Sequence, residues 1–449
     1  MGISSSSPGN PSLARRLGPL MLWGLGVGYV ISGMYFGWNL GLAEGGTLGL
    51  AIATAVIIIF YICFTFSYTE LACAIPKAGG AFDYATRGLG KAPGYVAGVA
   101  QIIEFVFAPP AIAAAIGAYF HIFFPQFSVT SIAVSAYLLF TGLNIYGVRA
   151  AAGFELLITS LAVLELLIFA GIALPHFHFH NLEEKAFPNG WNGVWASVPF
   201  AIWFFLGLEG VANVAEETVR PQRDILLGFG TALFTLIILC ALTFLSATGV
   251  AGWPAIVYPQ PGAPSSDSPL PMALSRITGN GGWAYHLLVG IGLMGLIASF
   301  HGLILAAGRA TFEFGRMRYV HPSVGRVHRR FHTPANALVV NMVIGILALV
   351  LGKTGEIIII SVLGALTLYI LSMISVFTLR RQEPNLERPF RVPAYPWLPA
   401  VALVIAGLAL LAMVRIYFLL SLAYFAILGL AYIWFYFFVQ TRRPHNGKS

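Results

Sequence analysis

Long apolar runs alternate with short polar connections along almost the whole chain. A helix that crosses a bilayer needs about 20 mainly apolar residues, and the runs reach or approach that length. The pattern therefore predicts an all-α integral membrane protein with twelve transmembrane helices. The predicted spans are 18–43, 47–73, 93–121, 128–147, 150–174, 193–217, 225–251, 283–312, 335–352, 356–379, 397–414 and 417–439.

The composition excludes most other classes of protein. Hydrophobic residues make up 58% of the 449 residues and charged residues only 9%, whereas an average soluble domain is about 25% charged. So few charges cannot cover a water-facing surface of this size, which excludes a soluble enzyme, a disordered chain and a coiled coil. The three cysteines include no CxxC pair, and no Walker A loop, HExxH or GxSxG motif occurs. We therefore expect no disulfide framework, no metal, no cofactor and no enzymatic activity.

The basic residues predict how the chain is oriented. All but four of the 25 Lys and Arg residues lie in alternate connections or in the two tails. Because basic connections stay in the cytoplasm, we expect the tails, 1–16 and 440–449, to be cytoplasmic. The net charge of +8 then reflects membrane orientation and not a nucleic-acid partner. The long connections on the other side are 175–192 and 252–282, and the second, rich in Pro and Ser, is expected to be a surface loop.

Two predicted helices, the first and the sixth, contain glycines in the middle of the span. Gly28, Gly33 and Gly37 interrupt the first, and Gly207 and Gly210 interrupt the sixth. Broken helices at matching positions of two halves are the best sequence indication of a transporter site at the bilayer midplane. Unwound backbone in hydrocarbon must bind a ligand or line a wet cavity. The alternative is that the glycines only allow close helix packing.

Acidic side chains also lie inside the predicted spans. Glu104 is near the centre of the third span, Glu209 is in the sixth-helix break and Glu165 is in the fifth span. A charge at the bilayer centre costs at least about 2.5–3.5 kcal/mol, so a functional role is the default hypothesis. No Lys or Arg lies at a span centre to pair with Glu104, which leaves a proton, a backbone donor or a transient cation. Glu209 and Glu165 are gating or proton-coupling candidates, although Glu209 could simply cap a helix. Glu70 and Glu155, nearer the cytoplasmic ends, are expected to be structural.

Aromatic residues accompany these acids and breaks. Trp38 follows the first break, and Trp203 and Phe205 precede the second. Aromatic faces together with one carboxylate form a receptor for an organic ammonium ion, although each aromatic taken singly is more often a packing residue. His301 in the eighth span could relay protons or line the path, or could be an ordinary core residue.

The chain resembles the amino acid–polyamine–organocation permease superfamily over nearly its whole length. Within the superfamily it is most similar to the ethanolamine permease group, on Phe36–Leu42 and on Glu104 with the stretch from Ala108 to Pro109. The motifs that carry the wider resemblance are Ile31-Ser32-Gly33, Pro76–Phe82, Leu143–Gly147, Gly207-Leu208-Glu209, Glu216-Glu217-Thr218, Arg220-Pro221 and Arg388-Pro389-Phe390.

The resemblance implies a LeuT-like five-plus-five inverted repeat with broken helices one and six. The first repeat would occupy 17–174 and the second 193–379, with spans eleven and twelve at 397–439. The substrate would lie between spans one, three, six and eight and would move by alternating access. The residues expected at this site are Ile31, Ser32, Gly33, Met34, Trp38, Glu104, Trp203, Phe205, Leu206, Gly207 and His301.

One departure from the family pattern bears on the substrate. In amino-acid members the first break usually reads Gly-Ser-Gly, and its free amides hold the substrate carboxylate. Here the first position is Ile31, whose side chain would crowd those amides and so favours an amine without a carboxylate. Some proton-coupled members have a lysine in span five, and the nearest residue here is Ala162, so that route of proton coupling is in doubt.

These observations together predict a secondary active transporter in the inner membrane of a bacterium. Its cargo would be a small organic amine, most favourably ethanolamine, with Glu104 holding the ammonium group and Trp203 and Phe205 packing over it. Its partners would be the amine, the lipid bilayer and, depending on the coupling, protons. An amino-acid permease of the same fold is the first alternative, and a non-transporting amine sensor is the second.

Overall fold

The computed structural model describes residues 17–77, 79–146 and 151–439. The two predicted cytoplasmic tails and the basic connection at Arg149 lie outside these residues, as does Ala78 of the 76–82 motif.

The described part of the chain is helical and contains no β-strand, in agreement with the predicted all-α class. A single isolated bridge joins Leu17 to Thr218. The helices are α1 Pro19–Val30, α2 Ser32–Tyr35, α3 Trp38–Ala74, α4 Ala81–Leu89, α5 Lys91–Phe123, α6 Val129–Tyr146, α7 Ala151–Ala173, η1 Leu174–His176, α8 His180–Glu183, α9 Gly190–Trp203, η2 Leu208–Glu217, α10 Pro221–Ala251, α11 Pro254–Val257, α12 Pro269–Thr278, α13 Trp283–Arg316, α14 Ala335–Leu351, α15 Thr354–Gln382, α16 Trp397–Ile416, α17 Phe418–Trp434 and η3 Phe435–Val439.

Ten helical segments in the described ranges are long and apolar enough to cross a membrane, and α1 and α14 are shorter apolar helices. The first two predicted spans share α1, α2 and α3. Within α3 the chain kinks at Gly46, where φ is +67°, so the kink falls between the predicted spans. The total of twelve spans and the inverted repeat stay predictions.

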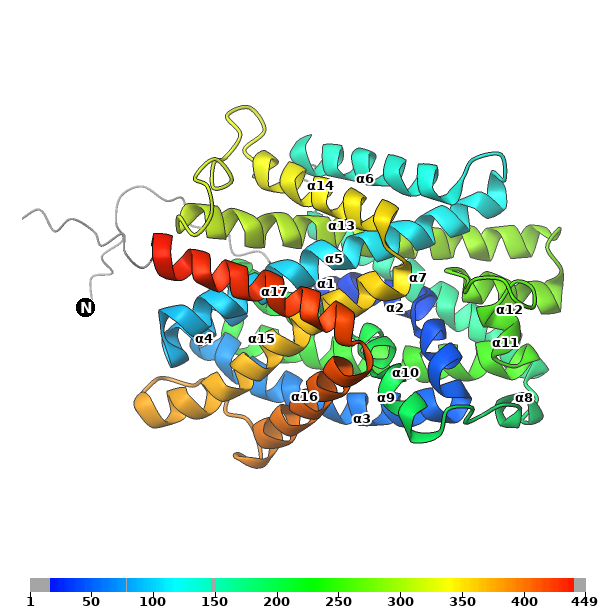
Figure 1. Cartoon of the computed structure of the whole chain (residues 1–449), viewed down its shortest axis with the longest axis horizontal. Helices are drawn as coiled ribbons and strands as arrows, with labels where there is room; N and C mark the ends of the chain where they lie inside the picture. The colour runs from blue at the N-terminus through cyan, green and yellow to red at the C-terminus, as the bar shows by residue number, and fades with distance from the viewer. Residues whose placement is uncertain (1–16, 78, 147–150, 440–449) are drawn as a thin grey trace, which may run out of the picture.

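The long helices run roughly side by side along the long axis of the molecule (Figure 1). Helix α5 lies at the centre, because it packs against α15, α13, α4 and α6. Large apolar side chains cover the outside, such as Leu139, Phe234 and Leu430, which are 59%, 67% and 67% exposed. An apolar exterior of this extent marks an interaction surface, and on a bundle of such helices the matching partner is lipid.

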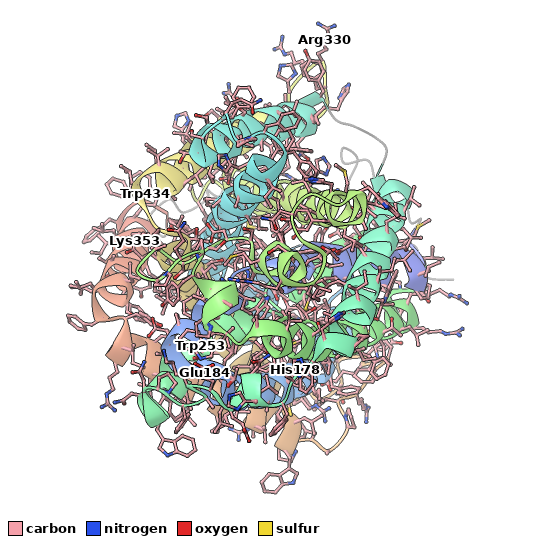
Figure 2. All side chains as sticks on the ribbon, turned by 90° about the vertical axis from the view of Figure 1, so that its right-hand side faces the viewer. His178, Glu184, Trp253, Arg330, Lys353 and Trp434 are labelled. Carbon is pink, nitrogen blue, oxygen red and sulfur yellow. The ribbon has the colours of Figure 1, made fainter. Side chains whose placement is uncertain are left out.

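The two ends of the bundle differ. Helices α8, α11 and α12 cover one end, named here the α12 end, which lies at the right of Figure 1 and faces the viewer in Figure 2 with His178, Glu184 and Trp253. The opposite end holds α4 and is named here the arginine-rich end, because the connections that meet there carry most of the basic residues.

The connection 252–282 differs from the expected surface loop. It contains α11 and α12, and Leu270 and Leu274 of α12 are only 3% and 2% exposed. Helix α12 packs against α10, α13 and α7. The Pro and Ser residues suggested a loop, but the apolar residues between them are spaced as on one face of a helix and are buried.

Candidate functional site

The first helix break lies inside the expected stretch between Gly28 and Trp38, but at its end and not at the Ile31-Ser32-Gly33 motif. Residue Ile31 has helical angles (φ −59°, ψ −24°), and its amide donates to the Val27 carbonyl at 2.8 Å. The helix is interrupted at Phe36, which is extended, and at Gly37, where φ is +87°. Glycine is suited to Gly37 because it adopts positive φ without steric cost. A Cβ at this position would also collide with the indole nitrogen of Trp203.

Side chains satisfy the backbone groups that this break leaves free. The indole of Trp203 donates to the Phe36 carbonyl at 3.1 Å, and the Asn39 side chain accepts from the Gly37 amide at 3.0 Å. Buried backbone groups need such partners. Trp203, a residue of the sixth predicted span, therefore stabilises the non-helical backbone of the first break.

The second break lies where it was expected. Helix α9 ends at Trp203, residues 204–207 form turns, and η2 begins after Gly207, whose φ is +92°. The helix that follows is of the 3₁₀ type and kinks at Val214, so this segment departs from α-helical geometry for about three turns of 3₁₀ helix.

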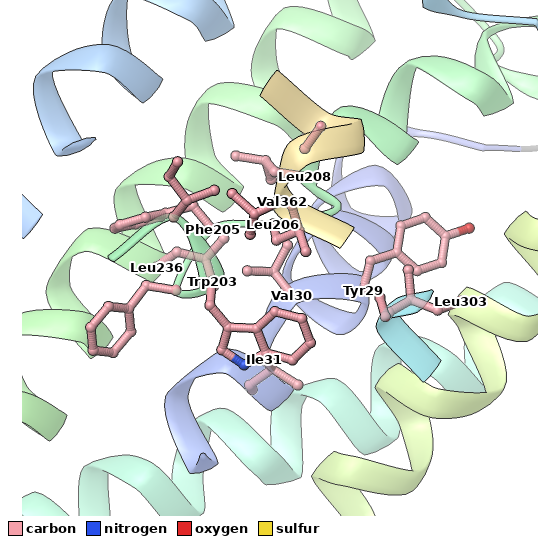
Figure 3. Close-up of a cluster of buried hydrophobic side chains, with 14 of the residues drawn as sticks. Tyr29, Val30, Ile31, Trp203, Phe205, Leu206, Leu208, Leu236, Leu303 and Val362 are labelled. Atoms are coloured by element: carbon pink, nitrogen blue, oxygen red, sulfur yellow. The ribbon is translucent and has the colours of Figure 1, made fainter. Parts of the chain in front are cut away.

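The two broken segments enclose a small buried cavity together with α5 and α13. Five of the predicted site residues line it: Ser32, Glu104, Trp203, Leu206 and Gly207. Its remaining walls come from Tyr29, Phe105, Ala108 and Leu303. Figure 3 shows Tyr29, Trp203, Leu206 and Leu303 in one buried cluster.

Glu104 brings a carboxyl group without a partner to this cavity. The side chain is fully buried, and neither carboxyl oxygen has a hydrogen-bond partner. None of the ion pairs among the described residues includes it. Only its backbone is held, because the Ser361 hydroxyl donates to the Glu104 carbonyl at 2.8 Å. A buried polar group with no partner is costly, so the Glu104 carboxyl is the group in this cavity that most needs an explanation.

Glu209 lies beside Glu104, close enough for the two carboxyl groups to interact electrostatically. Its Oε2 accepts from the Tyr369 hydroxyl at 2.9 Å, and that hydroxyl lies 3.1 Å from the hydroxyl of Tyr61. Its Oε1 has no partner. The side chain therefore joins η2 to α15, and the expected role as a simple helix cap does not account for these contacts.

Ser32 is held in place from α13. The Ser299 hydroxyl donates to the Tyr29 carbonyl at 2.7 Å and lies 2.9 Å from the Ser32 hydroxyl. These bonds fix the wall of the cavity between α1, α2 and α13.

Other predicted site residues surround the cavity without lining it. Ile31, Met34 and Phe205 are buried in the hydrophobic core. Gly33 packs directly on the Trp203 carbonyl. Trp38 stacks on a phenylalanine of the second break and donates to the Met34 carbonyl at 3.1 Å.

The structure places His301 outside the cavity. The ring is half-buried near Phe140 of α6, 6.2 Å between centroids. Ser299 and Leu303 face the site, and His301, two residues from each, points about 200° away around the helix. Helical phase, read from the sequence, distinguishes these positions.

Glu165 lies in a second small cavity, which shares no lining residue with the first. Its Oε2 accepts from the Tyr35 hydroxyl at 2.7 Å. Tyr119 also lines this cavity and donates to the Tyr35 carbonyl at 3.1 Å. Glu165 therefore connects α7 to α2 and does not join Glu104.

Sequence reasoning missed several residues of the first cavity and its surroundings. Tyr29 and Leu303 line the wall, Tyr369 hydrogen-bonds Glu209, and Tyr61 hydrogen-bonds Tyr369. The phase of the helix around Ser299 could have indicated Leu303. No sequence signal connects the two tyrosines, because they are 308 residues apart.

Hydrogen bonds and an ion pair join the broken segments to neighbouring connections and helices at both ends of the bundle. At the arginine-rich end, Leu17 exchanges backbone hydrogen bonds with the 217–219 segment at 3.0 Å, and Arg309 pairs with Glu217 at 3.2 Å. At the α12 end, Asn39 donates to the Ser266 carbonyl at 2.8 Å.

Asp267 ties the neighbouring connection to α15. Its carboxylate accepts from the Thr354 hydroxyl at 2.8 Å. Burial raises the pKa of Asp267 to about 6, and the hydrogen bond from Thr354 opposes that rise.

Comparisons with known proteins agree with this architecture. The family model described as amino acid permease matches residues 17–449. A transporter of Rhizobium meliloti, named as uncharacterized, is 29% identical over 437 residues, which cover 94% of this chain and 89% of that protein. The branched-chain amino acid permease BcaP of Bacillus subtilis is 24% identical, over 89% of this chain and 88% of its own. The methylthioribose transporter of the same organism is 25% identical, over 90% and 89%. The chain therefore belongs to the amino acid permease family of multi-pass membrane transport proteins.

Proposed function

We propose that this permease is a secondary active transporter that imports a small organic amine, most favourably ethanolamine, by alternating access. The observation that carries the proposal is the Glu104 carboxyl, which is fully buried, lines the cavity and has no hydrogen-bond or ion-pair partner among the described residues. An ammonium group supplies both the charge and the hydrogen-bond donors that this carboxyl lacks.

The walls of the cavity suit such a group. The faces of Trp203 and Phe105 attract a cation through their ring quadrupoles. The carbonyls near Leu206 and the Ser32 hydroxyl would accept the remaining ammonium hydrogens. Glu209 would respond to the neutralised Glu104 and change its bond to Tyr369, which links occupancy to movement of η2 against α15.

The electrostatics disfavour a substrate carboxylate. Glu104 and Glu209 lie side by side, and no described Lys or Arg pairs with either. A further carboxylate would be repelled by like charge. The amides of Ile31 and Gly37 are also occupied, by the Val27 carbonyl and the Asn39 side chain.

The orientation follows from the basic residues. The arginine-rich end would face the cytoplasm and the α12 end the outside, because cytoplasmic connections carry the excess of Lys and Arg. The membrane would be the inner membrane of a bacterium.

An amino-acid permease remains the second candidate function. The observation in its favour is the name of BcaP, a branched-chain amino acid permease that is similar over most of its length. None of the three relatives described above has a name that mentions ethanolamine.

Uptake into proteoliposomes tests the proposal. Labelled ethanolamine should accumulate inside, and unlabelled ethanolamine should compete better than any α-amino acid. Glu104→Gln should lower ethanolamine affinity by about 100-fold, the loss expected for a buried charged partner. Preferential uptake of an amino acid would favour the second candidate, and binding without uptake would favour a sensor.

Ile31→Gly tests the basis of selectivity. Removal of the side chain opens space beside the first break, so amines that carry a carboxylate should compete better than they do with the wild-type protein. Relative inhibition constants for ethanolamine and alanine measure this change. An unaltered ratio would remove Ile31 from the explanation of selectivity.

A further inference from the structure

The cavity around Glu165 lies near the α12 end of the bundle and apart from the Glu104 cavity. Tyr119 and Phe169 contribute to it from the last turns of α5 and α7, and Leu288 lies close to the start of α13. Leu270 and Leu274 of α12 cover it. In the proposed orientation, this cavity lies on the outer side, between the external solution and the first cavity.

The cavity contains one buried acidic group. Glu165 is 4% exposed. The hydroxyl of Tyr35 donates to its Oε2, but this donor carries no charge. No ion pair found in the described residues neutralises this side chain. A buried carboxylate without a counter-charge is costly, so the site is suited to receive a cation.

The surroundings discriminate between kinds of cation. A bare metal cation needs several oxygen ligands, whereas apart from Glu165 the oxygen donors from side chains that line this cavity are the hydroxyls of Tyr35 and Tyr119. One carboxylate and two hydroxyls are fewer oxygen ligands than such a cation takes. The other walls are the ring of Phe169 and aliphatic carbon. Carboxylate, ring faces and carbon together suit an organic ammonium group better than sodium.

We propose that the Glu165 cavity is a second, outer binding site for the ammonium group of the transported amine, occupied before the amine reaches Glu104. This inference rests on the proposed function, because it takes the same class of substrate. The two sites would be filled in sequence from the outside.

Occupancy of the outer site has a consequence for the outer gate. The Tyr35 hydroxyl ties α2 to α7 through Glu165 and the Ala162 carbonyl. An ammonium group on Glu165 competes with that hydroxyl for the carboxylate. Helix α2 belongs to the first broken segment, so binding at the outer site loosens the outer half of that segment from α7.

Equilibrium binding of labelled ethanolamine to the purified full-length protein tests the proposal. The wild-type protein should bind a second molecule at higher concentration after the first site is filled. Glu165→Gln should remove the weaker phase and keep the tighter one, and Glu104→Gln should do the reverse. Glu183→Gln, an exposed carboxylate at the same end of the bundle, is the control for surface charge and should keep both phases.

Side-specific transport provides a readout that a purely structural role would not change. In right-side-out proteoliposomes, Glu165→Gln should raise the KM for uptake from the outside by about tenfold, because it weakens one charged contact with the amine. The KM for efflux should stay at the wild-type value. Tyr35→Phe removes the competing hydroxyl, so it should tighten the weaker phase of binding.

The outcomes separate the two proposals. A single phase of ethanolamine binding that Glu165→Gln leaves unaltered would overturn the outer site and leave the proposed function standing. No ethanolamine binding to any variant would overturn the proposed function itself. A second phase that NaCl alone abolishes in competition would identify a sodium site and contradict the ammonium assignment.

Discussion

Glu70 and Glu104 are both buried carboxylates on long helices, and their surroundings are opposite. Glu70, near the end of α3, receives the Arg380 guanidinium in two hydrogen bonds, 2.8 and 2.5 Å, and the Val392 amide at 2.7 Å. The Arg388 guanidinium lies 3.3 Å away. Glu104, in the interior of α5, has no such partner.

The presence or absence of a counter-charge distinguishes a buried acid that stabilises the fold from one that is available to bind a ligand. A buried acid that stabilises the fold needs permanent counter-charges and donors, because desolvation otherwise exceeds the gain. Arg380 and Arg388, the latter from the Arg388-Pro389-Phe390 motif, supply the counter-charges, and the Val392 amide is a further donor. Arg380 also stacks over the Tyr395 ring, 4.1 Å from its centroid. In the proposed function the transporter must release its cargo, so an acid that binds the cargo would lack a permanent partner.

The largest expected effect on stability comes from breaking the Glu70 cluster. Glu70→Gln leaves the buried Arg388 without its full counter-charge and should destabilise the protein by about 3–5 kcal/mol. Thermal unfolding of the purified protein measures this loss. Glu383→Gln breaks the exposed pair with Arg87 and should cost less than about 1 kcal/mol. Equal losses in the two variants would contradict the comparison.

Glu104→Gln should behave in the opposite way. The ligand-free protein should unfold at the same temperature or a higher one, because an acid with no partner is replaced by a neutral group. The rise in Tm that ethanolamine causes in the wild-type protein should disappear, since a ligand stabilises only the state that binds it. A lower Tm without ligand would mean that Glu104 has a structural partner.

An intermediate effect is expected at the first helix break. Gly37→Ala forces a side chain into positive φ and against the Trp203 indole, which should cost about 1–3 kcal/mol. Gly290→Ala in α13 is the matched control, because a Cβ there meets nothing closer than 3.8 Å. Thermal unfolding and ethanolamine uptake of both variants check the prediction. A neutral Gly37→Ala would show that the break tolerates a side chain.

The smallest expected effect is on the pH dependence of stability, and it comes from Asp267, which lies outside the helices. Its pKa in the folded protein is about 6, above the ordinary 3.8. A raised pKa means that the charged carboxylate costs stability above pH 6, and that this cost disappears as the pH falls through 6 toward 3.8. The advantage in Tm of Asp267→Asn over wild type should therefore be larger at about pH 7.5 than at about pH 5. A difference that stays constant with pH would exclude this titration.

Much of the helical layout was predictable from the sequence. Long apolar runs must fold as helices in a bilayer, because every backbone polar group there needs an internal partner. The predicted segments accordingly fall on helices of the structure, and the boundary between the first two falls at Gly46. The helices of the 252–282 connection were not predicted, because short helices leave a weak periodic signal.

The candidate site was predictable only in part. Glu104 and Glu209 stand out because carboxylates are rare in apolar spans, and glycines mark both breaks. The stretch that contains the first break was expected, but its exact position at Phe36 and Gly37 was not, since it depends on a hydrogen bond from Trp203 and on one that Asn39 accepts. Tyr369 could not be predicted, because it reaches Glu209 across 160 residues of sequence.

The sequence by itself determined the membrane class, the apolar segments and which segments contain an acid, because these follow from local composition and length. Only the tertiary structure decided which acids are compensated. Arg380 reaches Glu70 from 310 residues away, while no described cation pairs with Glu104. Whether a buried charge has a counter-charge depends on which helices pack together, and that contact is not encoded in any single stretch of the chain.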